Sequence, residues 1–362
     1  MNASKAIKLK KQLEKVFWIT FSWVLISLWS FMNGYNTLKL LNCDLEGMDP
    51  SLYFSGSILT GVLAGVFGGT VMVFLWESWL RILTYGRSLF FIFLSFSLVY
   101  LMVSIPTNLY MATNLLDASL FSTEVWNWVL ANHLKFESLE NYLFWLLVVL
   151  VTLIVLQVND KYGPGVFRDF ILGKYFQPKR EERIFMFLDL RSSTSIAEKL
   201  GEARYFNFIN DVFKYATASI LNTRGEIYQY VGDEIVISWK VENGISNANC
   251  LRCFFEVQEA LQAKKNYFMQ TYGQVPEFKA GLHYGHVMAG EIGLVKRDIA
   301  FSGDVLNTTA RIQGKCNELG VNILLSKYLI DKLSSSIKAF SPQKIGDLLL
   351  KGKEEKMVLY TV

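Results

Sequence analysis

Four long stretches without a charged residue dominate the first 160 residues of this 362-residue chain. A helix needs roughly 20 apolar residues to cross a bilayer core of about 30 Å. The stretches therefore predict four membrane-spanning helices, with Pro106 expected to end or kink the third. A three-span anchor that lacks the last stretch is the alternative. The predicted anchor covers residues 1–159, with helices at about residues 16–38, 52–76, 88–110 and 141–159.

The charges that flank these stretches predict an orientation. Five lysines against Glu14 alone occupy the first 15 residues, and Arg81 and Arg87 outweigh Glu77 between the second and third spans. The other two links are acidic. Because basic flanks stay in the cytoplasm, we expect an integral protein of the plasma or inner membrane with a cytoplasmic N-terminus. An even number of spans then returns the C-terminal half to the cytoplasm.

Composition excludes several functions. The net charge of +4 lacks the basic stripe interleaved with aromatics that nucleic-acid binding requires. Membrane spans without an ionisable residue disfavour a transporter or channel. The four cysteines form no disulfide framework, and Cys250 and Cys253 are expected on one face of an amphipathic helix.

A row of small residues lies within the second span. Gly61, Gly65 and Gly69 recur every four residues, and Ser57 extends the row. Small residues at this spacing let another helix approach closely. The partner is either another helix of the same bundle or a second subunit.

The C-terminal half alternates strand and helix patterns. Residues 160–183 are expected to form a connector, in which Gly163-Pro-Gly165 ends the last span. Residues 184–362 then follow the order strand, helix, two strands, helix, strand, which is typical of a ferredoxin-like α+β domain with extra C-terminal elements. The predicted elements are a strand at 184–188, a helix opened by a capping box at Ser195 and Glu198, a hairpin at 226–231 and 235–239, a helix at 250–272, a hairpin at 278–283 and 287–292, and a helix at 305–319.

Two aspartates stand where strand-like runs end. Asp189 follows Ile184–Leu188, and Asp233 lies in the turn of the first hairpin. Mg²⁺ prefers one or two carboxylates together with phosphate oxygens and water, so the pair fits a metal–triphosphate site if the strands are adjacent. Backbone N–H groups at Arg191–Ser195, which include those of Ser193 and Thr194, would face the phosphates.

Two further groups point to phosphate chemistry. Asn307 and Arg311 stand four residues apart and share one face of a predicted helix. Asn can orient a ribose, and a guanidinium can stabilise a pentavalent phosphate. Near the C-terminus, Lys351 and Lys353 flank a glycine and can hold the β- and γ-phosphates.

Residues from about 184 to the C-terminus resemble the catalytic domain of class III adenylate and guanylate cyclases. The resemblance rests on Phe187-Leu-Asp189-Leu-Arg-Ser-Ser-Thr194, Val231-Gly-Asp233, Gly281-Leu-His-Tyr-Gly-His-Val-Met-Ala-Gly290 and Gly303-Asp-Val-Leu-Asn307-Thr-Thr-Ala-Arg311. It implies two Mg²⁺ or Mn²⁺ ions per site, held by Asp189, Asp233 and the carbonyl of Leu190. It also implies Asn307 and Arg311 at the transition state, Lys351 or Lys353 on the phosphates, and a homodimer whose sites lie at the subunit interface.

The resemblance implies conversion of ATP to 3′,5′-cyclic AMP and pyrophosphate by a membrane-bound enzyme, but the base-reading positions depart from the family pattern. Gln229 and Ala300 stand where many adenylate cyclases carry Lys and Asp or Thr. Gln can donate and accept, so it suits adenine or guanine. A guanylate cyclase and a membrane receptor with an inactive, nucleotide-binding domain are the alternatives. His283 and His286 are expected to be structural or solvent-facing.

Overall fold

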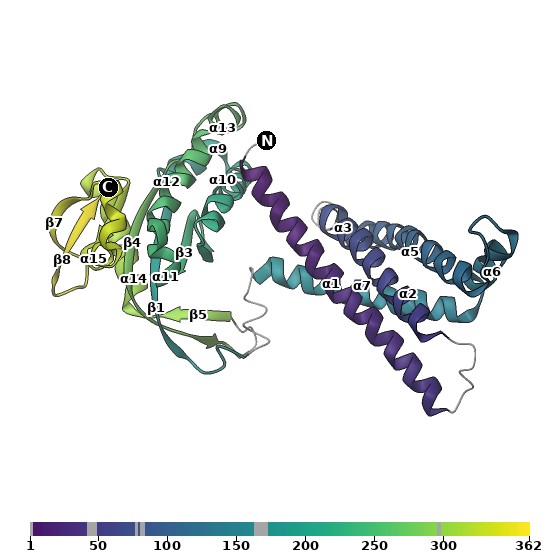
Figure 1. Ribbon diagram of the computed structural model, residues 1–362. Helices are drawn as coiled ribbons and strands as arrows, with labels where there is room; N and C mark the ends of the chain where they lie inside the picture. Colours follow the sequence, from purple (N-terminus) through teal and green to yellow (C-terminus); the bar gives the residue numbers. More distant parts are fainter. Residues whose placement is uncertain (1–2, 42–48, 77–78, 80–83, 163–172, 295–297) are drawn as a thin grey trace. The chain divides into compact units, whose positions relative to one another are not determined.

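The computed structural model describes residues 3–41, 49–76, 79, 84–162, 173–294 and 298–362. The chain divides into two compact units, Met1–Asp160 and Lys161–Val362, here called the N-terminal and C-terminal units (Figure 1). The helix break predicted at Gly163–Gly165 lies outside the described residues.

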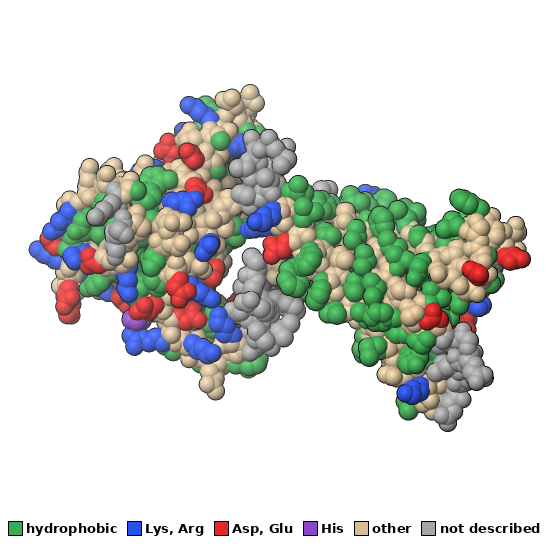
Figure 2. Space-filling view, in the orientation of Figure 1, with side chains coloured by type: hydrophobic (Ala, Val, Ile, Leu, Met, Phe, Trp, Pro, Cys, Tyr) green, Lys and Arg blue, Asp and Glu red, His purple; other side chains and the backbone are tan. Residues whose placement is uncertain are grey.

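The N-terminal unit is a bundle of long helices. Four of them are long and apolar enough to cross a membrane, Leu9–Leu40, Pro50–Trp76, Gly86–Leu115 and Phe136–Asn159, and each contains one predicted span. Hydrophobic side chains cover the surface of this unit, whereas charged side chains gather on the C-terminal unit (Figure 2). The short helix α6 was not predicted. The elements are α1 (Ala3–Leu40), α2 (Pro50–Leu63), η1 (Ala64–Gly68), α3 (Gly69–Val71), η2 (Met72–Trp76), α5 (Tyr85–Leu115), α6 (Thr123–His133) and α7 (Phe136–Tyr162).

The glycine row of the second span packs against α1 of the same chain. A Cβ added at Gly65 would lie 2.4 Å from Thr20 Cα, and one at Gly61 would lie 2.7 Å from Val24 Cα. Real Cβ atoms do not approach that closely, so glycine is required for this contact between backbones. The row therefore serves packing within one chain.

The C-terminal unit is built on one mixed sheet. Its strand order is β2-β3-β1-β4-β6-β8-β7, with β5 paired to β4. The first four strands and their connecting helices have the predicted ferredoxin-like order. The strands are β1 (Lys179–Leu190), β2 (Glu226–Val231), β3 (Glu234–Lys240), β4 (Phe278–Ile292), β5 (Asp298–Ser302), β6 (Ile323–Ser326), β7 (Gln343–Leu349) and β8 (Lys356–Thr361). The longer helices are α9 (Ser193–Leu200), α10 (Glu202–Asn222), α12 (Asn249–Gln262), α13 (Lys265–Tyr272), α14 (Asp304–Leu319) and α15 (Lys327–Leu333).

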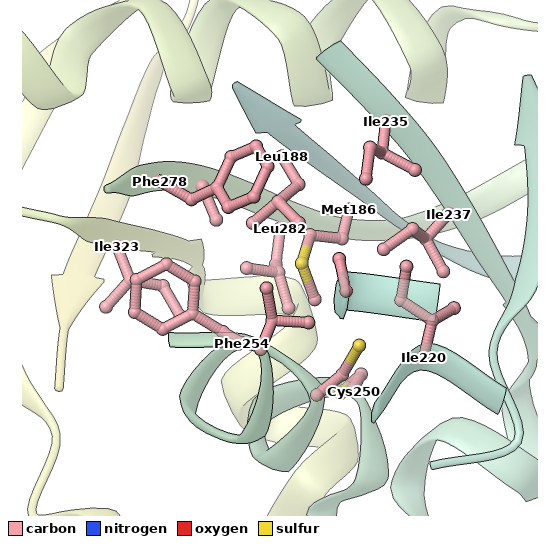
Figure 3. Close-up of a cluster of buried hydrophobic side chains, with 14 of the residues drawn as sticks. Met186, Leu188, Ile220, Ile235, Ile237, Cys250, Phe254, Phe278, Leu282 and Ile323 are labelled. Carbon is pink, nitrogen blue, oxygen red and sulfur yellow. The ribbon is translucent and has the colours of Figure 1, made fainter. Parts of the chain in front are cut away.

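Both faces of the sheet are covered, which explains the fully apolar sequence of β1. Met186 and Leu188 enter the larger core beneath α10 and α12 (Figure 3). Phe185 points to the other face, where it joins a smaller cluster with Val305 of α14. Cys250 is buried in the larger core, as the predicted amphipathic helix required, and burial raises the pKa of its thiol to about 12.

The hairpin predicted at residues 278–283 and 287–292 is wrong, because β4 runs unbroken through this segment. Its glycines are packing positions and not turn residues. A Cβ at Gly281 would lie 2.4 Å from the backbone nitrogen of Gln313, and one at Gly285 would lie 3.1 Å from Val305. These contacts bring α14 close against the strand. The hairpin at this place joins β4 to β5.

Three other predicted boundaries also differ. The first helix begins at Ser193, before the expected capping box, and Gly201 at φ 72° separates α9 from α10. The helix predicted over 250–272 is divided into α12 and α13. Strand β1 begins at Lys179 within the predicted connector, because its first residues pair with the far end of β4.

Candidate active site

Asp189 lies near the C-terminal end of β1, between strands β3 and β4. Glu234 of β3 and Lys279 of β4 are its paired residues. The Lys279 ammonium lies 3.0 Å from Asp189 Oδ2, and the side-chain amide of Gln313 donates to the same oxygen at 2.8 Å. The carboxylate is therefore held from two directions, by the sheet and by α14.

Asp233 belongs to the turn between β2 and β3, where Gly232 takes φ 62°. Asp233 is close enough to Asp189 to affect its pKa. Burial raises the pKa of Asp189, and the charge of Asp233 raises it further, whereas Lys279 and the hydrogen bond from Gln313 oppose the shift. Burial and both aspartates also raise the pKa of Glu234 to about 7. The negative charges of Asp189, Asp233 and Glu234 thus oppose one another, which makes a bound cation favourable.

The residues present fit a divalent metal that takes part of its coordination from a substrate. Within the described ranges, no three His, Cys, Asp or Glu side chains are close enough to hold an ion by themselves. Asp189 and Asp233 supply two carboxylates, which is the number that Mg²⁺ accepts when phosphate oxygens and water complete its shell. The role of the Leu190 carbonyl stays a prediction.

The predicted phosphate turn lies directly after Asp189. Ser192 takes the left-handed conformation at φ 55°, and α9 begins at the next residue. The first N–H groups of a helix have no acceptor within it, so those of Ser193 and Thr194 fit an anion. The side chain of Ser193 also hydrogen-bonds with Tyr205, whose pKa is raised by burial first and then by Asp233.

One of the predicted phosphate-binding lysines, Lys353, lies near the helix that carries the predicted transition-state residues. Arg311 Nη1 donates to the carbonyl of Gly352 at 3.4 Å, and Lys353 is ion-paired with Asp304 at the start of α14. Lys351 and Asn307 are exposed. The side chains of Arg311 and Lys353 therefore meet at one surface, as expected of groups that hold one triphosphate.

The structure does not bring all predicted residues together in one chain. Gln313 reaches Asp189, but Arg311, two positions earlier on α14, reaches Gly352. Two helical residues differ by about 200° in direction, so these side chains leave opposite sides of the helix. We call the first group (Asp189, Asp233, Glu234, Lys279 and Gln313) the carboxylate end and the second (Asn307, Arg311, Gly352 and Lys353) the basic end.

The predicted base-reading residues lie on two outer strands. Gln229 is exposed on β2, and Ala300 lies on β5, where it pairs with Gly290. Their neighbours touch: the rings of Tyr228 and Phe301 are 4.9 Å apart. The methyl group of Ala300 offers no hydrogen bond, so Gln229 is the polar group of this pair.

Lys279 was missed by sequence reasoning, because no local pattern marks it. It lies opposite Asp189 only because β1 and β4 pair antiparallel, and that register follows from burial and not from a motif. The predicted roles of the histidines are confirmed. His283 is buried against Ser326 Oγ at 2.7 Å, and His286 is exposed, 3.5 Å from Glu182.

Comparison with known proteins identifies the family of the C-terminal unit. Residues 176–362 match the family described as the adenylate and guanylate cyclase catalytic domain. The chain belongs to this family. The chain is 35% identical over 208 residues to adenylate cyclase 2 of Rhizobium meliloti, covering 58% of this chain and 57% of that protein. It is 30% identical over 184 residues to an adenylate cyclase of Anabaena cylindrica, covering 49% of this chain and 36% of that protein.

The chain thus spans only part of the length of these relatives. A bacterial light-regulated adenylyl cyclase of known structure has the same fold, with a TM-score of 0.51 at 20% identity, over 63% of this chain and 66% of the other. The cyclase domain therefore combines a ferredoxin-like core with the two ends described above.

Proposed function

We propose that this protein is a membrane-bound adenylate cyclase that converts ATP to 3′,5′-cyclic AMP and pyrophosphate at the interface of a homodimer. The observation that carries the proposal is the separation of the carboxylate and basic ends on opposite sides of α14. A triphosphate needs both ends, and one chain does not bring them together. Two copies related by a two-fold axis would present the carboxylate end of each to the basic end of the other.

The chemistry that two bound Mg²⁺ or Mn²⁺ ions supply, with Asp189, Asp233 and the Leu190 carbonyl as ligands, is charge neutralisation and a lower pKa for the ribose 3′-hydroxyl. The carboxylate end of the cyclase domain also provides Lys279, whose ammonium lies 3.0 Å from Asp189 Oδ2. A lysine beside a metal-binding carboxylate suits a phosphate oxygen, so we assign Lys279 to the triphosphate together with the N–H groups of Ser193 and Thr194.

The basic end supplies the remaining groups. Asn307 orients the ribose so that its 3′-oxygen attacks the α-phosphorus in line with the departing pyrophosphate. Arg311 stabilises the charge of the pentavalent phosphate, and Lys351 or Lys353 holds the β- and γ-phosphates. Lys353 must exchange its partner Asp304 for phosphate when substrate binds.

Adenine is the proposed base, read by Gln229 beside the apolar Ala300. The adenylate cyclase identity of the two relatives described above supports ATP. A receptor-type guanylate cyclase of Caenorhabditis elegans is also 27% identical over 186 residues, so GTP is the competing substrate. ATP is cytoplasmic, which accords with the orientation expected from the basic flanks of the spans.

The test is product formation by the full-length protein in membranes, given ATP or GTP with Mn²⁺ and then Mg²⁺, with products identified by mass. We expect cyclic AMP, and a loss of at least about 100-fold in Asp233→Asn, which keeps the shape but removes the charge. Asp347→Asn on exposed β7 is the matched control. Cyclic GMP would reassign the substrate. Neither product, from protein shown to be dimeric, would favour a nucleotide-binding receptor.

A further inference from the structure

A cavity lies inside the helical bundle of the N-terminal unit, remote in sequence from every residue assigned to the cyclase reaction. Its volume is about 110 Å³, and α1, α2 with its π-helical continuation, α5 and α7 all contribute to its wall. We call it the bundle cavity. An engineered apolar cavity of about 150 Å³ admits benzene, so the bundle cavity has room for about one six-membered ring.

One part of the wall is aromatic. Trp23 and Trp145 line it with ring centroids 5.7 Å apart, and Trp76 adds a third indole. Two of the indole N–H groups are already used. Trp23 donates to Thr152 at 3.1 Å, and Trp76 donates to Ser95 at 2.7 Å. These rings therefore present faces and edges to the cavity, which favours an apolar or aromatic occupant.

Another part of the wall is polar and uncharged. Ser104 bonds His133 of α6 at 3.0 Å, and the Asn108 side-chain carbonyl accepts from Asn132 at 3.0 Å. Within the described part of the chain, the two N–H donors of the Asn108 amide have no partner. A polar group in a bilayer is retained only where it is satisfied or used, so this donor suits a hydroxyl or carbonyl on a ligand.

The backbone is irregular on two sides of the cavity. Ala64 and Gly68 line it from a π-helical turn, η1, and a second such turn ends at Trp76. In α5, Pro106 interrupts the hydrogen-bond ladder next to the lining residues Ser104 and Asn108. π-helical turns are rare and occur frequently at functional sites. A bundle that served only as an anchor would not require these features together.

We propose that the bundle cavity binds a small uncharged amphipathic molecule, with a ring-sized apolar body against the tryptophans and a hydroxyl or carbonyl group at Asn108. Asp, Glu, Lys and Arg are absent from the described residues that line the cavity, so no side chain there would form an ion pair with a ligand. This inference concerns binding alone and does not depend on the proposed cyclase activity.

The experiment uses 4-bromophenol as the probe, because its bromine quenches tryptophan fluorescence and its hydroxyl matches the polar wall. Full-length protein in lipid nanodiscs is titrated, and we expect saturable quenching above the linear background from probe dissolved in lipid. Val103→Phe, which extends a buried lining side chain into the cavity, should weaken binding at least 10-fold. Leu101→Phe, two residues away and 46% exposed, is the matched control and should bind as the unmodified chain does.

A second variant guards against misfolding of the first. Asn108→Ala should weaken 4-bromophenol about 10-fold, the value of one hydrogen bond, and leave bromobenzene unchanged. Quenching that stays linear in all proteins would overturn the proposal. Equal loss of both probes in Asn108→Ala would overturn the assigned orientation of the polar group.

Discussion

The carboxylate end and the basic end of the cyclase domain contrast in charge and in burial. Asp189 and its partner Lys279 are 22% and 11% exposed, whereas Asp304 and Lys353 at the basic end are 65% and 28% exposed. The carboxylate end holds more acidic than basic side chains, and these lie at the edge of the sheet. The basic end presents Arg311 and Lys353 at the surface. The fold keeps the two sets of charges from neutralising each other.

This contrast has a local cause in α14. The helix is packed on β4 so closely that Gly281 faces its backbone, and this contact fixes the rotation of the helix. Gln313 is then directed to Asp189, and Arg311 is directed away from it. A helix held at another rotation would not give one chain two incomplete half-sites.

The strongest test of the contrast is complementation between two inactive variants. Asp189→Ala and Arg311→Ala should each retain less than about 1% of the cyclase activity, because each removes one end from both sites. Co-expression at equal levels should restore roughly a quarter of the activity, since half of randomly paired dimers would carry one intact site. Cyclic AMP is measured in membranes that contain both chains.

The control is co-expression of Asp189→Ala with Asp233→Ala, which damage the same end. No pairing of these chains gives an intact site, so activity should stay low. Equal activity in the two co-expressions would mean that the ends do not meet across a dimer.

Packing at Gly281 gives the next largest effect. Gly281→Ala places a Cβ 2.4 Å from the Gln313 backbone nitrogen, and we expect a loss of about 2–3 kcal/mol in the free energy of unfolding. Gly314→Ala is the control, since no atom lies within 4 Å of its added Cβ, and its helix propensity should improve stability by about 0.5–1 kcal/mol. Thermal unfolding of the full-length chain in detergent compares them. A Gly281→Ala protein as stable as Gly314→Ala would refute the close approach.

A buried histidine next to the basic end predicts a pH effect. Burial lowers the pKa of His283 to about 4, below the usual 6.5. The unfolded chain therefore takes up this proton first, so the stability is present above pH 6.5 and is lost as pH falls toward 4. The loss should approach about 3 kcal/mol. His283→Gln should flatten the decrease of melting temperature over this range, whereas the exposed His286→Gln should leave its slope unchanged.

The smallest effect is expected at the exposed ion pair. Lys353→Gln should change the free energy of unfolding by less than about 0.5 kcal/mol, because Asp304 is largely solvated. Lys279→Gln should cost more, since it leaves the half-buried Asp189 with fewer partners. Chemical denaturation measures both. Equal costs would contradict the difference in burial between the two ends.

The sequence predicted those features that local patterns determine. Uncharged stretches gave the four apolar helices, and strand-then-turn patterns gave Asp189 and Asp233. The predicted helix that carries Asn307 and Arg311 is confirmed as α14. The order of strands and helices gave the ferredoxin-like core.

Features that depend on pairing between distant residues were not predicted. The glycines of β4 have the same local signature as turn glycines, and only the neighbouring helix distinguishes them. Lys279 acquires its role through strand register, and the bundle cavity arises where four helices diverge. No local pattern specifies these contacts.

Strand β1 has a mechanical consequence. Its pairing with β4 continues from Lys179, within the predicted connector, to Leu190, one residue beyond Asp189. Tension applied along β1 would act in shear on all of these inter-strand hydrogen bonds at once, which is the direction in which paired strands resist separation most. A pull on the N-terminal end of β1 is therefore transmitted to the Asp189 carboxylate as the displacement of a stiff strand, with little lost to stretching.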